Sequence, residues 1–136
     1  MSKGNTTEND LMKYIFNKTV INWDSNTQVY IALHTDTPGE TGDQTTNESA
    51  YGSYARVAVQ RQAGAWTVAD NQAANAALIQ FPQCDGGSST VTYVTIGTQF
   101  SGTGQILYYG ELNDPLTVSN LIQPQFAIGA LTISED

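Results

Sequence analysis

The sequence predicts a mainly β protein, a single compact antiparallel β-sandwich or barrel with one short N-terminal helix. Three observations support this prediction. Short segments rich in β-branched and aromatic residues recur about every 8–12 residues between turn residues, which is typical of sandwiches and barrels. The length of 136 residues fits one domain of the commonest size. A helical spacing of apolar residues is convincing only near the N-terminus.

The first nine residues are polar, and the predicted helix follows them. We expect residues 1–9 to form a flexible N-terminal arm and residues 10–136 to form a single β-rich domain. Asn9 or Thr7 can cap the helix, since their side-chain oxygens can accept hydrogen bonds from its first free amides. One apolar helix face is predicted from the i, i+3, i+4, i+7 spacing of Leu11, Tyr14, Ile15 and Lys18, widened by Met12 and Phe16.

The predicted strands begin after a turn-rich stretch near residue 24. They are expected at residues 28–35, 54–61, 66–69, 76–81, 90–97, 105–112, 116–118 and 125–133. The turn at 101–104 predicts that the two strands beside it form a hairpin. Alternation within 54–61 places Val57 and Val59 on one face, Arg56 on the other and Arg61 at the strand end. A polar loop is expected at 36–51, and loops of this length are usually functional or mobile.

The formal net charge of -8 hides an uneven distribution of cations. All five basic residues precede residue 62, and they are Lys3, Lys13, Lys18, Arg56 and Arg61. Binding to nucleic acid or to an anionic membrane needs basic side chains, so we exclude both partners. Apolar runs stay far below the ~20 residues of a membrane span, and the N-terminus lacks the apolar core of a signal peptide. We expect a soluble protein made in a cytosol.

Few residues suggest chemistry. His34 ends a predicted strand and could pair with Asp36, but no G-x-S-x-G serine motif accompanies it. We therefore expect His34 to anchor a loop through a hydrogen bond. Cys84 is the only cysteine, which excludes an intrachain disulfide and a cysteine-based metal site. Free cysteines are usually buried, and we expect Cys84 to be a buried apolar residue.

Two further site hypotheses stay open. Clustered carboxylates can bind Ca²⁺, and Asp36, Glu40 and Asp43 share the 36–51 loop, with Asp24 elsewhere. Their spacing does not match an EF-hand, so solvated loop charge is the alternative. Tyrosines could form a sugar-binding patch, or they could fill sheet faces; these are Tyr51, Tyr54, Tyr93, Tyr108 and Tyr109. The sequence predicts no catalytic, cofactor-binding or metal-binding residue, no cofactor and no enzymatic activity.

Segments spread in order over nearly the whole chain carry the motifs of a known family. They are VYIALHTDTPGETG at 29–42, YARVAV at 54–59, NAALIQFP at 75–82, VTYVTIG at 91–97, LYYGEL at 107–112 and FAIGALTISED at 126–136. These segments resemble the motifs of small tailed-phage virion proteins that are often labelled tail fibre or virion structural proteins. The chain departs from the family pattern GDLDI at Ala130 and Thr132, so any role of those two acids is lost.

The resemblance implies a non-enzymatic structural protein, assembled in the host bacterial cytoplasm and exposed on the outer surface of the virion. A receptor-binding fibre normally needs a trimeric shaft and a long repetitive sequence, and this sequence has neither repeats nor a coiled coil. We therefore expect a capsid decoration (cement) protein that binds the outer shell and bridges capsid subunits. The alternative is a tail fibre or tail-tip protein for host attachment, with or without carbohydrate binding.

The expected partners are the major capsid protein or other virion structural proteins. We also expect a homo-oligomer, for example a trimer. All five cations lie in residues 1–61, so we expect docking on the virion to use the N-terminal portion and to leave the acidic remainder facing solvent.

Overall fold

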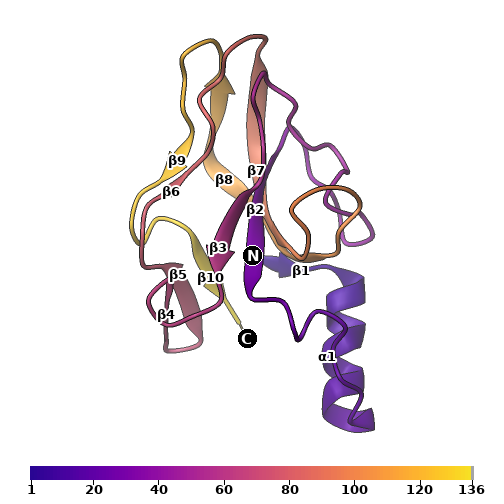
Figure 1. The fold of residues 1–136 in the computed structure, drawn as a ribbon. Coiled ribbons are helices and arrows are strands. Elements are labelled where there is room, and N and C mark those ends of the chain that lie inside the picture. The colour runs from indigo at the N-terminus through magenta and orange to yellow at the C-terminus, as the bar shows by residue number, and fades with distance from the viewer. Residues whose placement is uncertain (136) are drawn as a thin grey trace.

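Residues 1–135, which the computed structural model describes, form antiparallel β-sheets and one helix that projects from them (Figure 1). The elements in chain order are β1 (Ser2–Lys3), α1 (Asn5–Asn17), β2 (Gln28–His34), β3 (Val57–Gln60), β4 (Trp66–Ala69), β5 (Gln72–Asn75), β6 (Ile79–Gln80), β7 (Ser89–Gly97), β8 (Ile106–Val118), β9 (Gln125–Phe126) and β10 (Thr132–Ser134). The predicted mainly β fold with one N-terminal helix is confirmed.

The largest sheet has five strands in the order β1-β8-β7-β2-β3. The predicted hairpin of β7 and β8 is present, with Tyr93 opposite Glu111 and Ile96 opposite Tyr108. The predicted separate strand at 116–118 belongs to β8, because a wide bulge leaves residues 112–115 opposite Thr92 alone before pairing resumes. The bulge bends β8, as bulges do, and this long bent strand borders the groove described below.

Two smaller sheets, ordered β10-β5-β4 and β6-β9, pack against one face of the large sheet. Between the layers lies the core, as in a sandwich. The large sheet and the smaller sheets with their flanking residues both contribute fully or almost fully buried side chains, among them Ile31, Leu33, Val94, Ile96, Ile79, Phe81, Leu131 and Ile133.

One predicted strand is shortened in the structure and another is divided. The chain leaves β5 at Asn75, whose side-chain amide donates to Ala77 O and Ala127 O and whose Oδ1 accepts from Leu131 N. The predicted strand 76–81 is thereby reduced to β6. The predicted strand 125–133 is split into β9 and β10 by a turn in which Gly129 has a φ of 79°, a value that favours glycine.

The predicted flexible arm at residues 1–9 is wrong. Ser2 and Lys3 pair with Tyr109 and Tyr108 of β8, and α1 begins at Asn5 rather than near residue 10. Neither Thr7 nor Asn9 caps the helix; the N-cap is Gly4, without a side-chain cap. A side chain at Gly4 could not fit, because a Cβ would lie 2.9 Å from Ile106 O.

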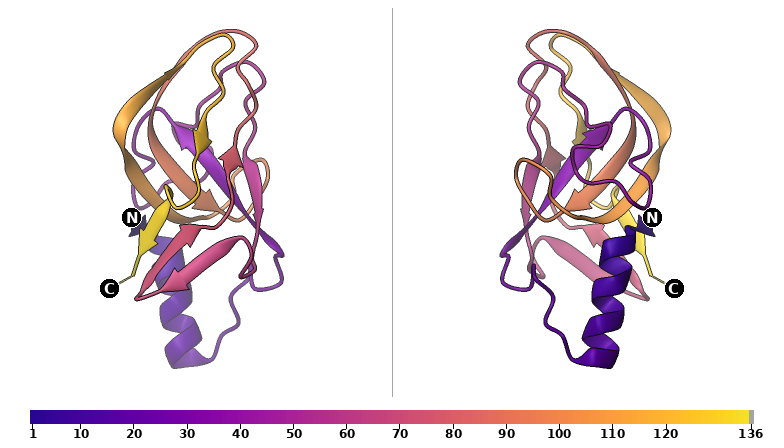
Figure 2. Two further views of the ribbon diagram at one scale, coloured as in Figure 1. Left: turned by 90° about the vertical axis from the view of Figure 1, so that its left-hand side faces the viewer. Right: turned by 90° about the vertical axis from the view of Figure 1, so that its right-hand side faces the viewer.

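The helix extends beyond the sheets in both side views (Figure 2). Its predicted apolar face is not packed on the body: Met12, Ile15 and Phe16 are 56%, 65% and 74% exposed. The helix ends at Lys18, which adopts the left-handed conformation. Within residues 1–135, no helix has both the length and the apolar character that a membrane crossing needs.

Candidate functional site

The 36–51 loop is fixed to the large sheet through His34, whose side chain is completely buried. Nδ1 lies 2.8 Å from Thr46 O, so it carries the proton and donates to that carbonyl. Nε2 then accepts from Thr95 Oγ1 at 2.8 Å. Burial lowers the pKa of His34 below its ordinary 6.5 and favours the neutral ring. The predicted loop-anchoring bond is present, whereas Asp36 instead accepts from Thr37 N.

A buried ion pair that the sequence reading missed lies beside His34. Arg56 Nε and Nη2 donate to the two carboxylate oxygens of Glu48 at 2.7 and 2.9 Å, and the Arg56 side chain is only 3% exposed. The guanidinium also donates to Gln99 O and Gly102 O, and Tyr54 Oη donates to Glu48. The pair therefore ties the 36–51 loop to the β7–β8 connection.

The acidic residues of the loop serve local turns. Asp43 Oδ1 accepts from Thr45 N at 2.7 Å and from the Thr45 hydroxyl, and these hydrogen bonds hold the pKa of Asp43 below its usual value. Glu40 and Asp24 have exposed side chains. Across residues 1–135, no three His, Cys, Asp or Glu side chains gather as metal ligands would. The calcium hypothesis thus gains no ligand set from the structure.

The five tyrosines do not form one patch. Tyr51 and Tyr54 lie in the core, their rings 5.4 Å apart edge to face, and burial raises the pKa of Tyr51 to about 12. The hydroxyl of Tyr108 is bonded to Glu135. Only Tyr93 and Tyr109 line a common surface groove. Cys84 is fully buried, as predicted, and its Sγ lies 3.2 Å from Gly86 O.

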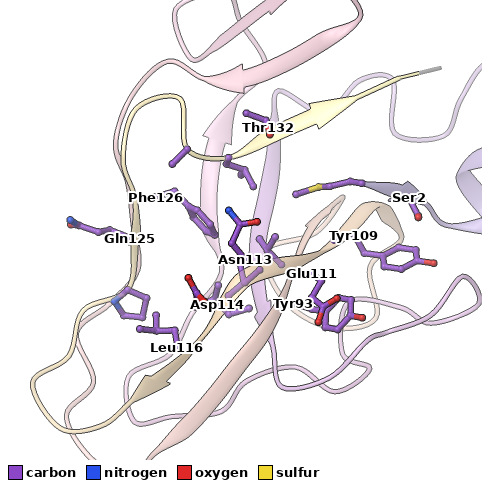
Figure 3. Close-up of a pocket in the computed structure, with 18 residues that line it drawn as sticks. Ser2, Tyr93, Tyr109, Glu111, Asn113, Asp114, Leu116, Gln125, Phe126 and Thr132 are labelled. Atoms are coloured by element: carbon purple, nitrogen blue, oxygen red, sulfur yellow. The ribbon is translucent and has the colours of Figure 1, made fainter.

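That groove, about 860 Å³ in volume, lies between β8 and the 124–132 segment (Figure 3). We call it the β8 groove. Apolar side chains, Leu112, Leu116 and Phe126, line it together with the exposed acids Glu111 and Asp114. The described residues around it include no lysine or arginine. The sequence does not predict this groove because its walls come from segments that are distant in the chain.

A second pocket, about 740 Å³ in volume, holds both tryptophans, Trp23 and Trp66, together with Val68. Its lining is mostly apolar, and its charged members are Arg61 and Glu135. Glu135 already forms a salt bridge with Lys3.

The third surface feature is the exposed side of α1, which we call the helix face and define as Met12, Lys13, Ile15 and Phe16. These residues recur at the i, i+3, i+4 spacing that brings side chains together on a helix. Lys13 takes part in none of the ion pairs of residues 1–135. An apolar, basic helix face and an acidic groove are surfaces suited to contacts between proteins.

Comparison with known families matches residues 2–134 to the family described as Podophage GP4 fiber I protein gp80. The matched span includes α1 and all the strands described above. The match confirms the resemblance to small tailed-phage virion proteins. The search of curated proteins found no match for the chain.

Proposed function

Because the chain belongs to the family described as Podophage GP4 fiber I protein gp80, and is thus a virion-associated structural protein, we propose that it is a non-enzymatic subunit of a tail fibre. It is assembled in the cytoplasm of the bacterial host and stands on the outer surface of a podophage virion. The family description favours this fibre role over the capsid decoration expected from the small size of the chain.

The observation that carries the proposal is the projecting helix. Met12, Ile15 and Phe16 are each more than half exposed, although burying such side chains is favourable by about 1.5–3 kcal/mol each. Contiguous exposed apolar residues of this kind mark sites of contact with other proteins. The helix is therefore the element through which the subunit attaches to copies of itself or to other virion structural proteins.

The chemistry of the buried groups supports a structural role. Both ring nitrogens of His34 are used by internal hydrogen bonds, and Cys84 is fully buried. The Arg56–Glu48 pair joins two loops rather than facing the β8 groove. These groups are engaged inside the fold, as expected of a structural subunit.

Electron microscopy of virions labelled with gold-conjugated antibodies to this chain tests the location. We expect gold at the tail fibres and a low copy number relative to the major capsid protein by densitometry. Virions that lack the fibres are the matched control and should lose the label. Label spread over the shell, with hundreds of copies per particle, would reject the fibre proposal in favour of capsid decoration.

A further inference from the structure

We propose that α1 of one copy of this chain docks in the β8 groove of a second copy. This inference rests on the proposed function, because it specifies how subunits of the fibre associate. It assigns a role to two surfaces that the body of a single copy leaves open, the helix face and the groove.

The second half of α1 needs a partner. The helix is held to the body near its N-terminus, where Asn5 N donates to Glu40 O at 2.8 Å and Thr7 Oγ1 donates to Ile106 O at 2.8 Å. Gln105 Nε2 adds a bond to Asp10 at 2.9 Å. In the described part of the chain, no hydrogen bond joins the α1 residues after Asp10 to the sheets. Isolated helices shorter than ~12–15 residues are marginal in water, so docking would stabilise this half.

Charge complementarity identifies the β8 groove as the docking site. Residues 11–23 carry Lys13 and Lys18 and no acid, whereas the residues that line the groove include Glu111 and Asp114 and no lysine or arginine. None of these four side chains forms an ion pair within residues 1–135. A chain with a net charge of -8 repels its own copies, and a contact between these lysines and acids opposes that repulsion locally.

The shapes of the two surfaces also correspond. Met12, Ile15 and Phe16 follow the i, i+3, i+4 pattern by which an amphipathic helix enters an apolar groove. The groove supplies Leu112, Leu116 and Phe126 beside its acids. The second pocket is a poorer match, since its one acid, Glu135, is already bonded to Lys3 and Tyr108.

The occupant comes from another copy rather than from the same chain. In one copy, α1 runs away from the sheets (Figures 1 and 2), so its helix face cannot reach its own groove. The helix and the groove are different surfaces, so two copies can exchange helices in a closed dimer, or each copy can pass its helix to the next in a heterologous contact. Heterologous contacts repeat from copy to copy and either close into a ring or extend as a filament.

Disulfide cross-linking between two differently labelled variants tests the docking directly. Phe16→Cys chains are mixed with Leu116→Cys chains under mild oxidation, and the native Cys84 does not interfere because it is fully buried. The control replaces Leu116→Cys by Val68→Cys, which is 74% exposed and lines the second pocket. We expect about tenfold more mixed dimer with Leu116→Cys, equivalent to a preference of about 1.4 kcal/mol. Equal yields from the two mixtures would overturn the proposal.

Charge reversal tests the same contact without cysteines. Light scattering measures self-association of Lys13→Glu/Lys18→Glu, of Glu111→Lys/Asp114→Lys and of the chain that combines all four changes. We expect about tenfold weaker association for each double variant, and recovery in the combined chain. Asp24→Lys, an exposed change away from the groove, is the control and should associate like the wild type. A wild-type chain that stays monomeric, or a combined chain that fails to recover, contradicts the docking.

The two proposals fail in different ways. Gold label at the tail with no self-association would retain the fibre role and reject only the helix-in-groove contact, leaving another virion protein as the partner of α1. Self-association together with label over the shell would reject the fibre role alone.

Discussion

Arg56 and Glu48 form a buried contact that couples separate segments of this small protein. The guanidinium uses both carboxylate oxygens of Glu48 and two backbone carbonyls. A buried pair adds little to stability relative to a well-packed apolar replacement, but removal of one partner leaves an uncompensated buried charge. Single substitutions should therefore be costly.

Glu48→Gln should lower the free energy of unfolding by about 3 kcal/mol, the lower end of the range for a broken buried pair. The lower end applies because the Glu48 side chain is 16% exposed. Urea denaturation measures the change. Lys13→Gln also changes one charge, but on an exposed side chain, and should stay within about 0.5 kcal/mol of the wild type. A loss below about 1 kcal/mol in Glu48→Gln would mean that the pair is not effectively desolvated.

His34 should make stability depend on pH. Burial holds its folded-state pKa below 6.5, so the unfolded chain binds more protons as the pH falls below about 7. The free energy of unfolding must then decrease on acidification, by up to about 1 kcal/mol between pH 7 and pH 5.5. Denaturation at several pH values should show this slope in the wild type and a flatter one in His34→Asn. Equal slopes would assign the dependence to another group.

The sequence allows some of these residue environments to be predicted and hides others. The burial of Cys84 and the loop-anchoring bond of His34 follow from residue type and position. Alternation predicts Arg56 on the face of its strand opposite Val57 and Val59. In the structure the loops at 36–51 and 98–105 cover that face as well. The alternation within a strand does not predict this covering, since the 98–105 loop lies more than 40 residues away in the chain.

At the scale of elements, the 36–51 loop and the β7–β8 connection are locked together by Gln44. The side chain of Gln44 is completely buried, and its Oε1 accepts from Gln99 N at 3.0 Å. The backbone N–H of Gln44 donates to Gly104 O at 2.9 Å. The space around it exists only because two neighbours, Gly97 and Gly104, lack a Cβ. Glycine is required at both positions because the Gln44 side chain lies too close to leave room for a Cβ, and not because the backbone φ is unusual.

Gly104→Ala should displace Gln44, because the added Cβ would lie 1.8 Å from its Oε1. Overpacking of this kind costs about 1–3 kcal/mol, and we expect about 2 kcal/mol by urea denaturation. Gly86→Ala is the matched control, since nothing lies within 4 Å of its added Cβ. An unchanged stability in Gly104→Ala would show that Gln44 can move aside without cost.

Element prediction succeeded where pairing partners are adjacent in the chain. The hairpin of β7 and β8 and the short strand β4 follow from β-branched residues and flanking turns. The shortening of 76–81 and the division of 125–133 depend on Asn75, which hydrogen-bonds to both segments. The order of residues 1–9 depends on β8, about 100 residues away. Contacts between segments so far apart in the chain produce no periodic residue pattern from which they could be predicted.

In the folded molecule, three of the five basic side chains make internal contacts, and the other two lie on one exposed element. Of the five cations, Lys3 and Arg56 are used in internal ion pairs. Arg61 donates to carbonyls of the 23–26 turn. Lys13 and Lys18 remain, both exposed on or directly after the projecting helix. Lys13 and Lys18, which form no ion pair within residues 1–135, thus lie beside the exposed apolar residues of α1, which supports α1 as the attachment element.

Trypsin, which cuts after lysine and arginine, should report whether α1 is covered in the assembled particle. In the free protein we expect cleavage after the exposed Lys13, Lys18 and Arg61, while the buried Arg56 is spared. In intact virions a docked helix should slow cleavage after Lys13 and Lys18 about tenfold or more, because proteolysis follows the population of the open form. Arg61 lies outside the helix face and serves as the internal control, with an unchanged rate by mass spectrometry. Equal slowing at all three sites would indicate general shielding by the particle, and no slowing at Lys13 or Lys18 would show that the helix stays free on the virion.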